Sequence, residues 1–236
     1  MQRIHKLVNR QTLLILGLVI TLISYGQNNL NPNIRSEGQT IRAFIPTGWK
    51  LLDSASGDLN KDGWNDVAIV IETIEKVNTS EFEEDHRYTS RILLILWNRP
   101  EGGYKLVARN NRFITEHDNP QMDEPFEDIV IKNGTLRISF KHFYSIGSWY
   151  TYQYEYIFRY QGNQFALIGA QMGSFHRATH ESEEYSYNFS TKKRSLTVEN
   201  EKGKRVTWNN ISVDKLKTLD DPQIPYQWEV EKGVFL

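Results

Sequence analysis

The sequence predicts an all-β protein built mostly from antiparallel hairpins. Three observations support this fold class: apolar runs of strand length that are rich in β-branched residues, a long segment that alternates aromatic and polar residues, and tight-turn sequences such as Asn133-Gly134 between predicted strands. No segment after the N-terminal region has a sustained helical period. We therefore expect at most one short helix there, a single turn at residues 214–219.

The first 26 residues have the pattern of a secretory signal peptide. Arg3, Lys6 and Arg10 supply positive charge, residues 13–23 form an apolar core, and Ser24-Tyr25-Gly26 places small residues at a cleavage site. The apolar core is shorter than the roughly 20 residues of a membrane span. We expect cleavage after Gly26 and a secreted or periplasmic protein without a stable membrane anchor, and we favour this over an uncleaved anchor.

Composition restricts the classes of partner and the sources of stability. The chain has 28 Lys and Arg and 29 Asp and Glu, and loss of three basic residues with the signal peptide leaves a net charge of −4. Such a chain has no electrostatic attraction to nucleic acid, so we expect no nucleic-acid partner. It also has no Cys, so an exported form must rely on its hydrophobic core instead of disulfides.

The mature chain of about 210 residues is long enough for one large domain or two small ones. A polar linker at residues 27–39 precedes the predicted β-rich domain at 40–236. The polar segment at 113–127 contains Asn119-Pro120 and Glu124-Pro125, which interrupt regular structure. We expect the boundary to lie there if the domain has two halves.

The first half of the domain contains two strongly apolar strands. We expect the first ordered element at residues 41–45. Continuous apolar runs at 67–74 and 91–97 are typical of strands that are buried on both faces. The charged segment between them, residues 75–91, is predicted to be a solvated loop, and a second cation site is the less favoured alternative.

The segment before the first apolar run, residues 57–66, predicts a calcium site. Oxygen-bearing side chains recur at every second residue, a glycine follows where the chain must turn, and a further Asp closes the set. Ca²⁺ takes about six to eight oxygen ligands, and a loop that curls around it presents alternate side chains inward. The predicted ligands are Asp58, Asn60, Asp62, the carbonyl of Trp64, and Asp66.

Residues beyond the loop distinguish between classes of calcium motif. An EF-hand requires Glu at the twelfth position and flanking helices, whereas Ile69 stands there and a strand follows. The segment resembles the calcium loops of FG-GAP/VCBS repeats, the integrin-type β-propeller motif. This resemblance covers about fifteen residues in a single copy. It implies a calcium-binding loop between two strands, in a sandwich or a partial propeller.

Two alternatives to a functional calcium site remain open. Asp, Asn and Gly are also favoured in metal-free surface turns. If calcium does bind, all of its ligands come from one loop, and a structural role is favoured over a catalytic one.

The segment from Tyr150 to Tyr160 has an aromatic residue at every even position, so six rings project from one face of a predicted strand. This strand is expected to pair with residues 165–170. The favoured interpretation of the rings is core packing. The functional alternative is a platform for sugar rings or a peptide. The candidate ligand-binding residues are Tyr150, Tyr152, Tyr154 and Tyr156.

No catalytic residue is predicted, because the chain lacks Cys, a Gly-x-Ser-x-Gly elbow and a phosphate-binding glycine-rich loop. We expect a calcium-binding protein with a non-enzymatic binding or structural role toward glycans or proteins. The alternative is a carboxylate-dependent hydrolase acting on glycans, with acids from residues 81–85 or 181–184. An exposed aromatic stripe would favour the binding role, and a cleft that joins two carboxylates of raised pKa would favour the enzyme.

Overall fold

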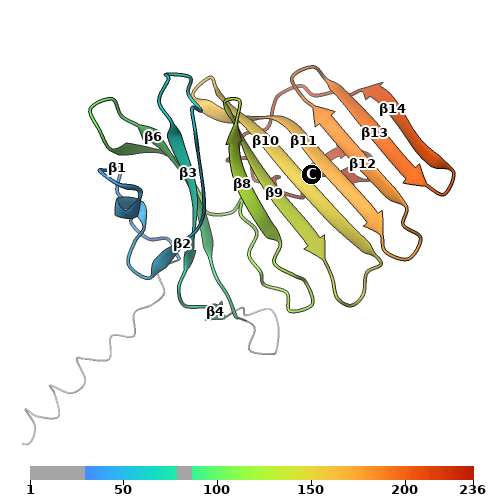
Figure 1. The fold of residues 1–236 in the computed structure, drawn as a ribbon, viewed down its shortest axis with the longest axis horizontal. Helices are drawn as coiled ribbons and strands as arrows, with labels where there is room; N and C mark the ends of the chain where they lie inside the picture. The colour runs from blue at the N-terminus through green and yellow to red at the C-terminus, as the bar shows by residue number, and fades with distance from the viewer. Residues whose placement is uncertain (1–29, 79–86) are drawn as a thin grey trace, which may run out of the picture.

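The computed structural model describes residues 30–78 and 87–236, and antiparallel strands dominate them (Figure 1). No α-helix occurs in these residues, which confirms the predicted fold class. The predicted signal peptide and the acidic segment at 81–85 lie outside the described residues. Within the described part of the chain, no helix is long and apolar enough to span a bilayer.

Two sheets form the body of the protein. The N-terminal sheet has five strands in the order β1-β7-β6-β3-β2. Its strands are β1 (Glu37–Gly38), β2 (Trp49–Gly57), β3 (Asp66–Thr73), β6 (Arg91–Asn98) and β7 (Tyr104–Asn110). A small hairpin of β4 (Val77–Asn78) and β5 (Arg87–Tyr88) lies between β3 and β6 in the chain.

The C-terminal sheet has seven strands, each paired with the next strand in sequence. They are β8 (Phe126–Lys132), β9 (Thr135–Phe143), β10 (Tyr150–Gln161), β11 (Gln164–His176), β12 (Ser182–Asn188), β13 (Lys193–Asn200) and β14 (Gly203–Asn210). Asn133 and Gly134 join β8 to β9 with φ values of 53° and 68°, as a type I′ turn requires. The pairing of β10 with β11 confirms the predicted hairpin.

The N-terminal sheet is buried on both faces at β3 and β6, as the two apolar runs predicted. Every residue of β3 is buried, and one face, with Ala68 and Val70, points toward the C-terminal sheet. The other face packs under the N-terminal residues, including Phe44 and Trp49. The prediction that ordered structure begins at residue 41 is wrong, because β1 precedes it and pairs with β7. Residues Ile41–Phe44 form the short 3-10 helix η2, which buries Phe44.

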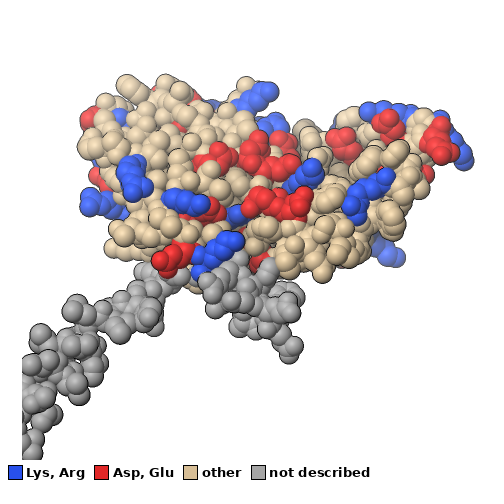
Figure 2. Space-filling model, turned by 60° about the horizontal axis from the view of Figure 1, so that its bottom comes forward, with Lys and Arg blue, Asp and Glu red and all other residues tan. Residues whose placement is uncertain are grey.

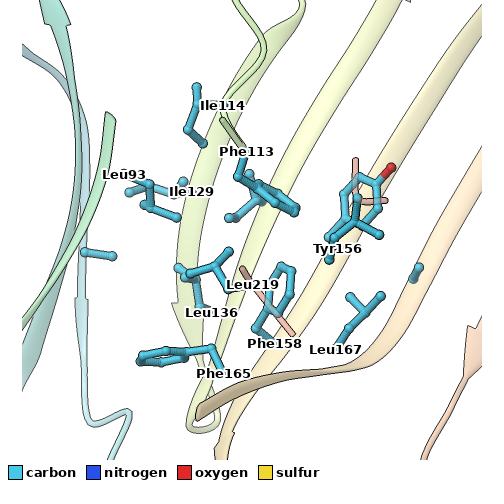
Figure 3. Packing of buried hydrophobic residues seen from close by; sticks show 14 of the residues in the cluster. Leu93, Phe113, Ile114, Ile129, Leu136, Tyr156, Phe158, Phe165, Leu167 and Leu219 are labelled. Carbon is cyan, nitrogen blue, oxygen red and sulfur yellow. The ribbon is translucent and has the colours of Figure 1, made fainter. Parts of the chain in front are cut away.

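The main core lies between the two sheets and draws on both of them (Figure 3). Leu93 of β6 faces Ile129 of β8, while Phe113, from the connection between the sheets, packs edge-on against Tyr156 with ring centroids 5.3 Å apart. Leu219 from the C-terminal segment closes the same core. The segment predicted to be a possible boundary, 113–127, therefore contributes directly to the shared core.

The C-terminal segment crosses the C-terminal sheet and ends in the hairpin of β15 (Glu229–Glu231) and β16 (Val234–Phe235). The helical turn predicted at 214–219 is wrong. Instead, the N–H of Leu167 donates to the carbonyl of Lys217 at 2.8 Å. The N–H of Leu219 donates to the carbonyl of Phe165 at 2.9 Å. These bonds hold the segment extended along β11, which a helix would not permit.

Candidate functional site

The predicted calcium loop connects β2 to β3, which pair with each other. Its oxygen-bearing side chains act as turn acceptors. Asp58 accepts hydrogen bonds from the N–H groups of Lys61 at 2.6 Å and Gly63 at 3.0 Å, and Asp62 accepts one from Trp64 at 2.8 Å. Gly63 has a φ of 90°, which favours glycine at this turn.

Asp66 has a different role from the other loop carboxylates because it is fully buried. It accepts hydrogen bonds from the N–H groups of Leu59 at 2.9 Å and Asn60 at 3.3 Å in the loop, and from Asn98 at 3.1 Å at the end of β6. Burial raises the pKa of Asp66, and these backbone donors oppose that rise. The carboxylate therefore joins the loop, β3 and β6 at one point.

The loop lies where the two sheets meet. The N–H of Ile129 in β8 donates to Asp53 of β2 at 2.9 Å, so edge strands of the two sheets are linked side by side (Figure 1). A Cβ atom at Gly57 would come within 2.5 Å of Ile131 in β8, which shows how closely the chain approaches there. Leu59 within the loop is 1% exposed and belongs to the shared core. The loop conformation is thus coupled to the packing of both sheets.

The loop residues fit calcium by their chemistry. Three carboxylates and one amide provide the oxygen donors that a hard cation prefers, and an ionised carboxylate can accept about four contacts. The side chains retain acceptor capacity beyond the hydrogen bonds of the turn. Asp62, for example, accepts only from Trp64 and from the Asn60 amide within the described residues.

The side chains are not arranged around an ion in this conformation. The Asn60 amide nitrogen donates to Asp62 at 2.8 Å. No group of three or more His, Cys, Asp or Glu side chains in the described residues surrounds a common point as metal ligands do. Binding of calcium through Asp58, Asn60, Asp62 and Asp66 would therefore require Asn60 and Asp62 to separate and turn toward a shared centre.

The aromatic stripe of β10 runs from the core to the surface. Tyr156 and Phe158 are fully buried, so this half of the stripe is core, as the favoured interpretation had it. Tyr154 is half-buried against Tyr226, with ring centroids 4.9 Å apart, and burial raises its pKa to about 12. Of the four candidate ligand-binding residues, Tyr156 is thus inaccessible to a ligand and Tyr154 is largely covered.

The stripe reaches solvent at Tyr150 and Tyr152. Their rings stack with centroids 6.0 Å apart, and Tyr150 is 43% exposed. Tyr150 borders a hollow of about 310 Å³ that combines an aromatic ring with hydroxyl, carboxylate and amide groups. The hollow is lined by Tyr150, Ser174, Glu181, Ser182, Glu183, Val198 and Asn200. Sequence reasoning singled out Tyr150 and the acids but missed Ser174 and Asn200, which only strand pairing brings to the same place.

A larger hollow of about 580 Å³ lies on the other face of the same strands. It is lined mainly by alternate residues of β9, β10 and β11, including Phe143, Gln153 and Phe175, and no sequence signal predicted it. The guanidinium of Arg177 lies 4.8 Å from the centre of the Phe143 ring. This face of the sheet thus offers a second, mixed polar and aromatic surface.

A third cleft, of about 610 Å³, lies between the connection of the two sheets and the C-terminal segment. Glu116 and Asp118 both line it, and Tyr226 forms part of its opposite wall. Burial raises the pKa of Glu116, and the nearby Asp118 raises it further. These acids lie outside the two segments in which sequence reasoning placed candidate catalytic groups.

An ion-pair network around the buried Arg91 holds this connection against β6. Arg91 is 3% exposed and donates to both carboxylate oxygens of Glu124 at 2.6 and 2.7 Å, and to the carbonyl of Thr115 at 2.6 Å. Glu72 lies 3.6 Å from the same guanidinium. Burial opposes ionisation of Glu124, but its bonds to Arg91 outweigh this effect and lower its pKa.

Charged side chains of both signs share the surface. On the face shown in Figure 2, Asp and Glu gather in the middle, and Lys and Arg lie around and between them. That face has no continuous basic patch of the kind that binds a nucleic-acid backbone.

Comparisons of the chain with protein families, with curated proteins and with solved structures find no match. The resemblance to FG-GAP/VCBS calcium loops therefore depends on residues 57–71 alone.

Proposed function

We propose that this chain is an exported calcium-binding protein whose role is non-enzymatic binding of glycans. The observation that carries the binding role is the point where the aromatic stripe leaves the core. There Tyr150 borders a hollow that also contains Ser174, Glu183 and Asn200. Aromatic faces pack on the apolar face of a sugar ring, while hydroxyl, carboxylate and amide groups hydrogen-bond sugar hydroxyls.

Calcium has a structural role in this proposal. The loop lies between Gly57, which packs on β8, and Asp66, which is bonded to the end of β6. An ion bound by the loop would hold Asn60 and Asp62 around a shared centre, and would thereby stabilise the loop ends at Gly57 and Asp66 and the contact between the sheets. Exported proteins meet calcium concentrations that can occupy even weak sites, with dissociation constants of about 10⁻⁴–10⁻³ M.

Thermal unfolding of the mature protein in calcium and in chelator tests the calcium site. Calcium at about 100 times its dissociation constant is expected to stabilise the folded protein by about 2.7 kcal/mol, which raises the melting temperature by about 5–10 °C. Asp62→Ala is expected to remove this difference. Asp128→Ala, which alters an exposed carboxylate of β8, is the matched control and is expected to retain it. Equal melting temperatures for the unmutated protein in calcium and in chelator would show that the loop binds no calcium.

Calorimetric titration with a panel of oligosaccharides tests the binding role. For any sugar that binds, Tyr150→Ala is expected to weaken affinity at least about tenfold, because the stacking surface is lost. The matched control is Phe175→Ala, which removes a ring of nearly equal exposure, 42% against 43%, from a neighbouring strand. Affinity lost in the Phe175 variant and retained in the Tyr150 variant would assign binding to the opposite face of the sheet and contradict the proposed site.

A carboxylate-dependent glycan hydrolase is the second candidate function. The cleft that contains Glu116 and Asp118 favours it, because a carboxyl of raised pKa can act as a general acid beside an ionised partner. Hydrolysis of an oligosaccharide that is lost in Glu116→Gln would support this candidate. In that case the Tyr150 hollow would serve as an accessory site, and the protein would be an enzyme.

A further inference from the structure

The free edge of the C-terminal sheet is the most exposed of the strands whose burial the structure describes. β14 lies at the end of the sheet and pairs only with β13 among the described residues (Figure 1). All eight of its residues are exposed. Trp208 is 70% exposed, more than any other large apolar side chain in the described residues, and Val206 is 48% exposed. An unpaired edge that exposes two large apolar side chains is a template for another strand.

The direction of the backbone groups along β14 follows from its pairing. Hydrogen-bonded pairs alternate with non-bonded pairs in an antiparallel ladder. The N–H of Ile211 donates to the carbonyl of Lys192, one position beyond the ladder, so odd-numbered residues of β14 bond to β13. The N–H and C=O groups of even-numbered residues therefore point away from the sheet. These residues are Lys204, Val206, Trp208 and Asn210.

We infer that β14 pairs with β14 of a second copy of this chain, antiparallel and centred on Thr207, and joins two seven-stranded sheets into one. A two-fold axis perpendicular to the sheet keeps equivalent faces on the same side, and this axis places Val206 of each copy opposite Trp208 of the other. All outward-pointing backbone groups of the strand then find partners. The pairing buries the apolar side chains that are exposed in the single chain.

Ladder length and apolar pairing favour this register over the neighbouring one. Centring on Thr207 places Lys204 opposite Asn210 and Arg205 opposite Asn209, so neither cation faces a like charge. Centring on Val206 instead would place Lys204 opposite Trp208. Asn210 would then lie opposite no residue of β14 in the second copy. The proposed register thus gives both the longer ladder and the apolar cross-strand pair.

Cysteine cross-linking tests the register directly, because the chain contains no Cys. In the proposed pair, the two Thr207 Cα atoms face each other at about 4.5 Å, within the range of about 4.4–6.8 Å that a disulfide spans. Thr207→Cys is therefore expected to give a disulfide-linked dimer on mild oxidation. Arg205→Cys is the matched control on the same strand. Its two copies lie four strand positions apart, roughly 13 Å, and are expected to remain uncoupled.

Light scattering across a concentration series tests association without a cross-link. One strand pair buries less than the roughly 1,200–2,000 Å² of a stable interface, so we expect a weak dimer with a dissociation constant on the order of 10–100 µM. Trp208→Ala is expected to weaken it at least about tenfold. Trp149→Ala, which removes an indole that is 65% exposed elsewhere, is expected to leave it unchanged.

Two results would overturn the inference. One is a monomer at all concentrations up to about 1 mM together with no dimer from Thr207→Cys. The other is a cross-link from Val206→Cys and not from Thr207→Cys, which would show pairing in the register that we reject. Both readouts are independent of calcium and of glycan binding, so failure of the proposed function would not affect them.

Discussion

Replacement of Asp66 by Asn separates the two kinds of carboxylate in the β2–β3 loop. The side chain keeps its shape but loses its charge and one of its two acceptor oxygens. Asp66 accepts from Leu59 and Asn60 on one oxygen and from Asn98 on the other. In the variant, whichever way the amide turns, its NH₂ group faces a backbone N–H, and two donors cannot form a hydrogen bond.

The magnitude follows from these contacts. In the better orientation, the amide oxygen still accepts from the N–H groups of Leu59 and Asn60. The NH₂ group then faces the N–H of Asn98. Loss of a hydrogen bond to a charged acceptor costs about 1.5–3 kcal/mol, and leaving a buried donor unpaired costs about 1–3 kcal/mol. A neutral amide is easier to bury than a carboxylate, which offsets part of this loss. We expect a net decrease of about 2–4 kcal/mol in the free energy of unfolding.

Urea denaturation at pH 7 in chelator, followed by tryptophan fluorescence, measures this decrease. Asp62→Asn is the matched control, because Asp62 is exposed in the same loop and its oxygen facing Trp64 remains in the variant. We expect it to cost less than about 1 kcal/mol in chelator. Equal losses for the two variants would refute the reasoning that Asp66 alone joins the loop to β6.

Three further predictions concern the interior. Arg91→Met is expected to lower the free energy of unfolding by about 1.5–3 kcal/mol in urea denaturation, because it removes the hydrogen bonds to the Glu124 carboxylate, while Glu72 keeps Lys50 at 3.0 Å. A loss below about 1 kcal/mol would contradict this. Leu59→Ala is expected to lower the free energy of unfolding by about 2–5 kcal/mol in the same assay, because Leu59 is 1% exposed in the shared core. An unchanged urea midpoint would show that Leu59 does not anchor the loop in this core. Burial lowers the pKa of His142 below the value of about 6.5 that it has in an unfolded chain, so the unfolded state binds the proton more readily. The free energy of unfolding is therefore expected to fall as the pH drops below about 6.5, and His142→Phe is expected to reduce that fall; identical pH profiles would rule out His142 as its source.

Much of the fold could be predicted because local patterns determine it. Continuous apolar runs before and after the charged loop correctly indicated β3 and β6 as strands buried on both faces. Asn133-Gly134 correctly placed a hairpin, since both residues adopt the positive φ that its turn requires. The alternation in β10 correctly indicated one aromatic face.

Long-range pairing determines what the sequence could not show. Residues 214–219 have no strong strand pattern, and their extended form depends on bonds to Phe165 and Leu167 of β11. The hollow beside Tyr150 needs three further strands in register, and Glu116 acquires its raised pKa from burial by distant segments. The calcium ligands that the loop motif predicts stay a prediction, and the motif did not indicate the role of Asp66 as an acceptor for Asn98 of β6.

The shared core has a consequence for how the protein denatures. Leu93 and Ile129 come from different sheets yet cover each other, and Phe113 bridges toward Tyr156. If one sheet unfolded alone, the apolar face of the other sheet would become exposed to water. Partial unfolding is therefore strongly disfavoured. Fluorescence and circular dichroism are therefore expected to report one cooperative transition, in which the β2–β3 loop and the hollow beside Tyr150 unfold together.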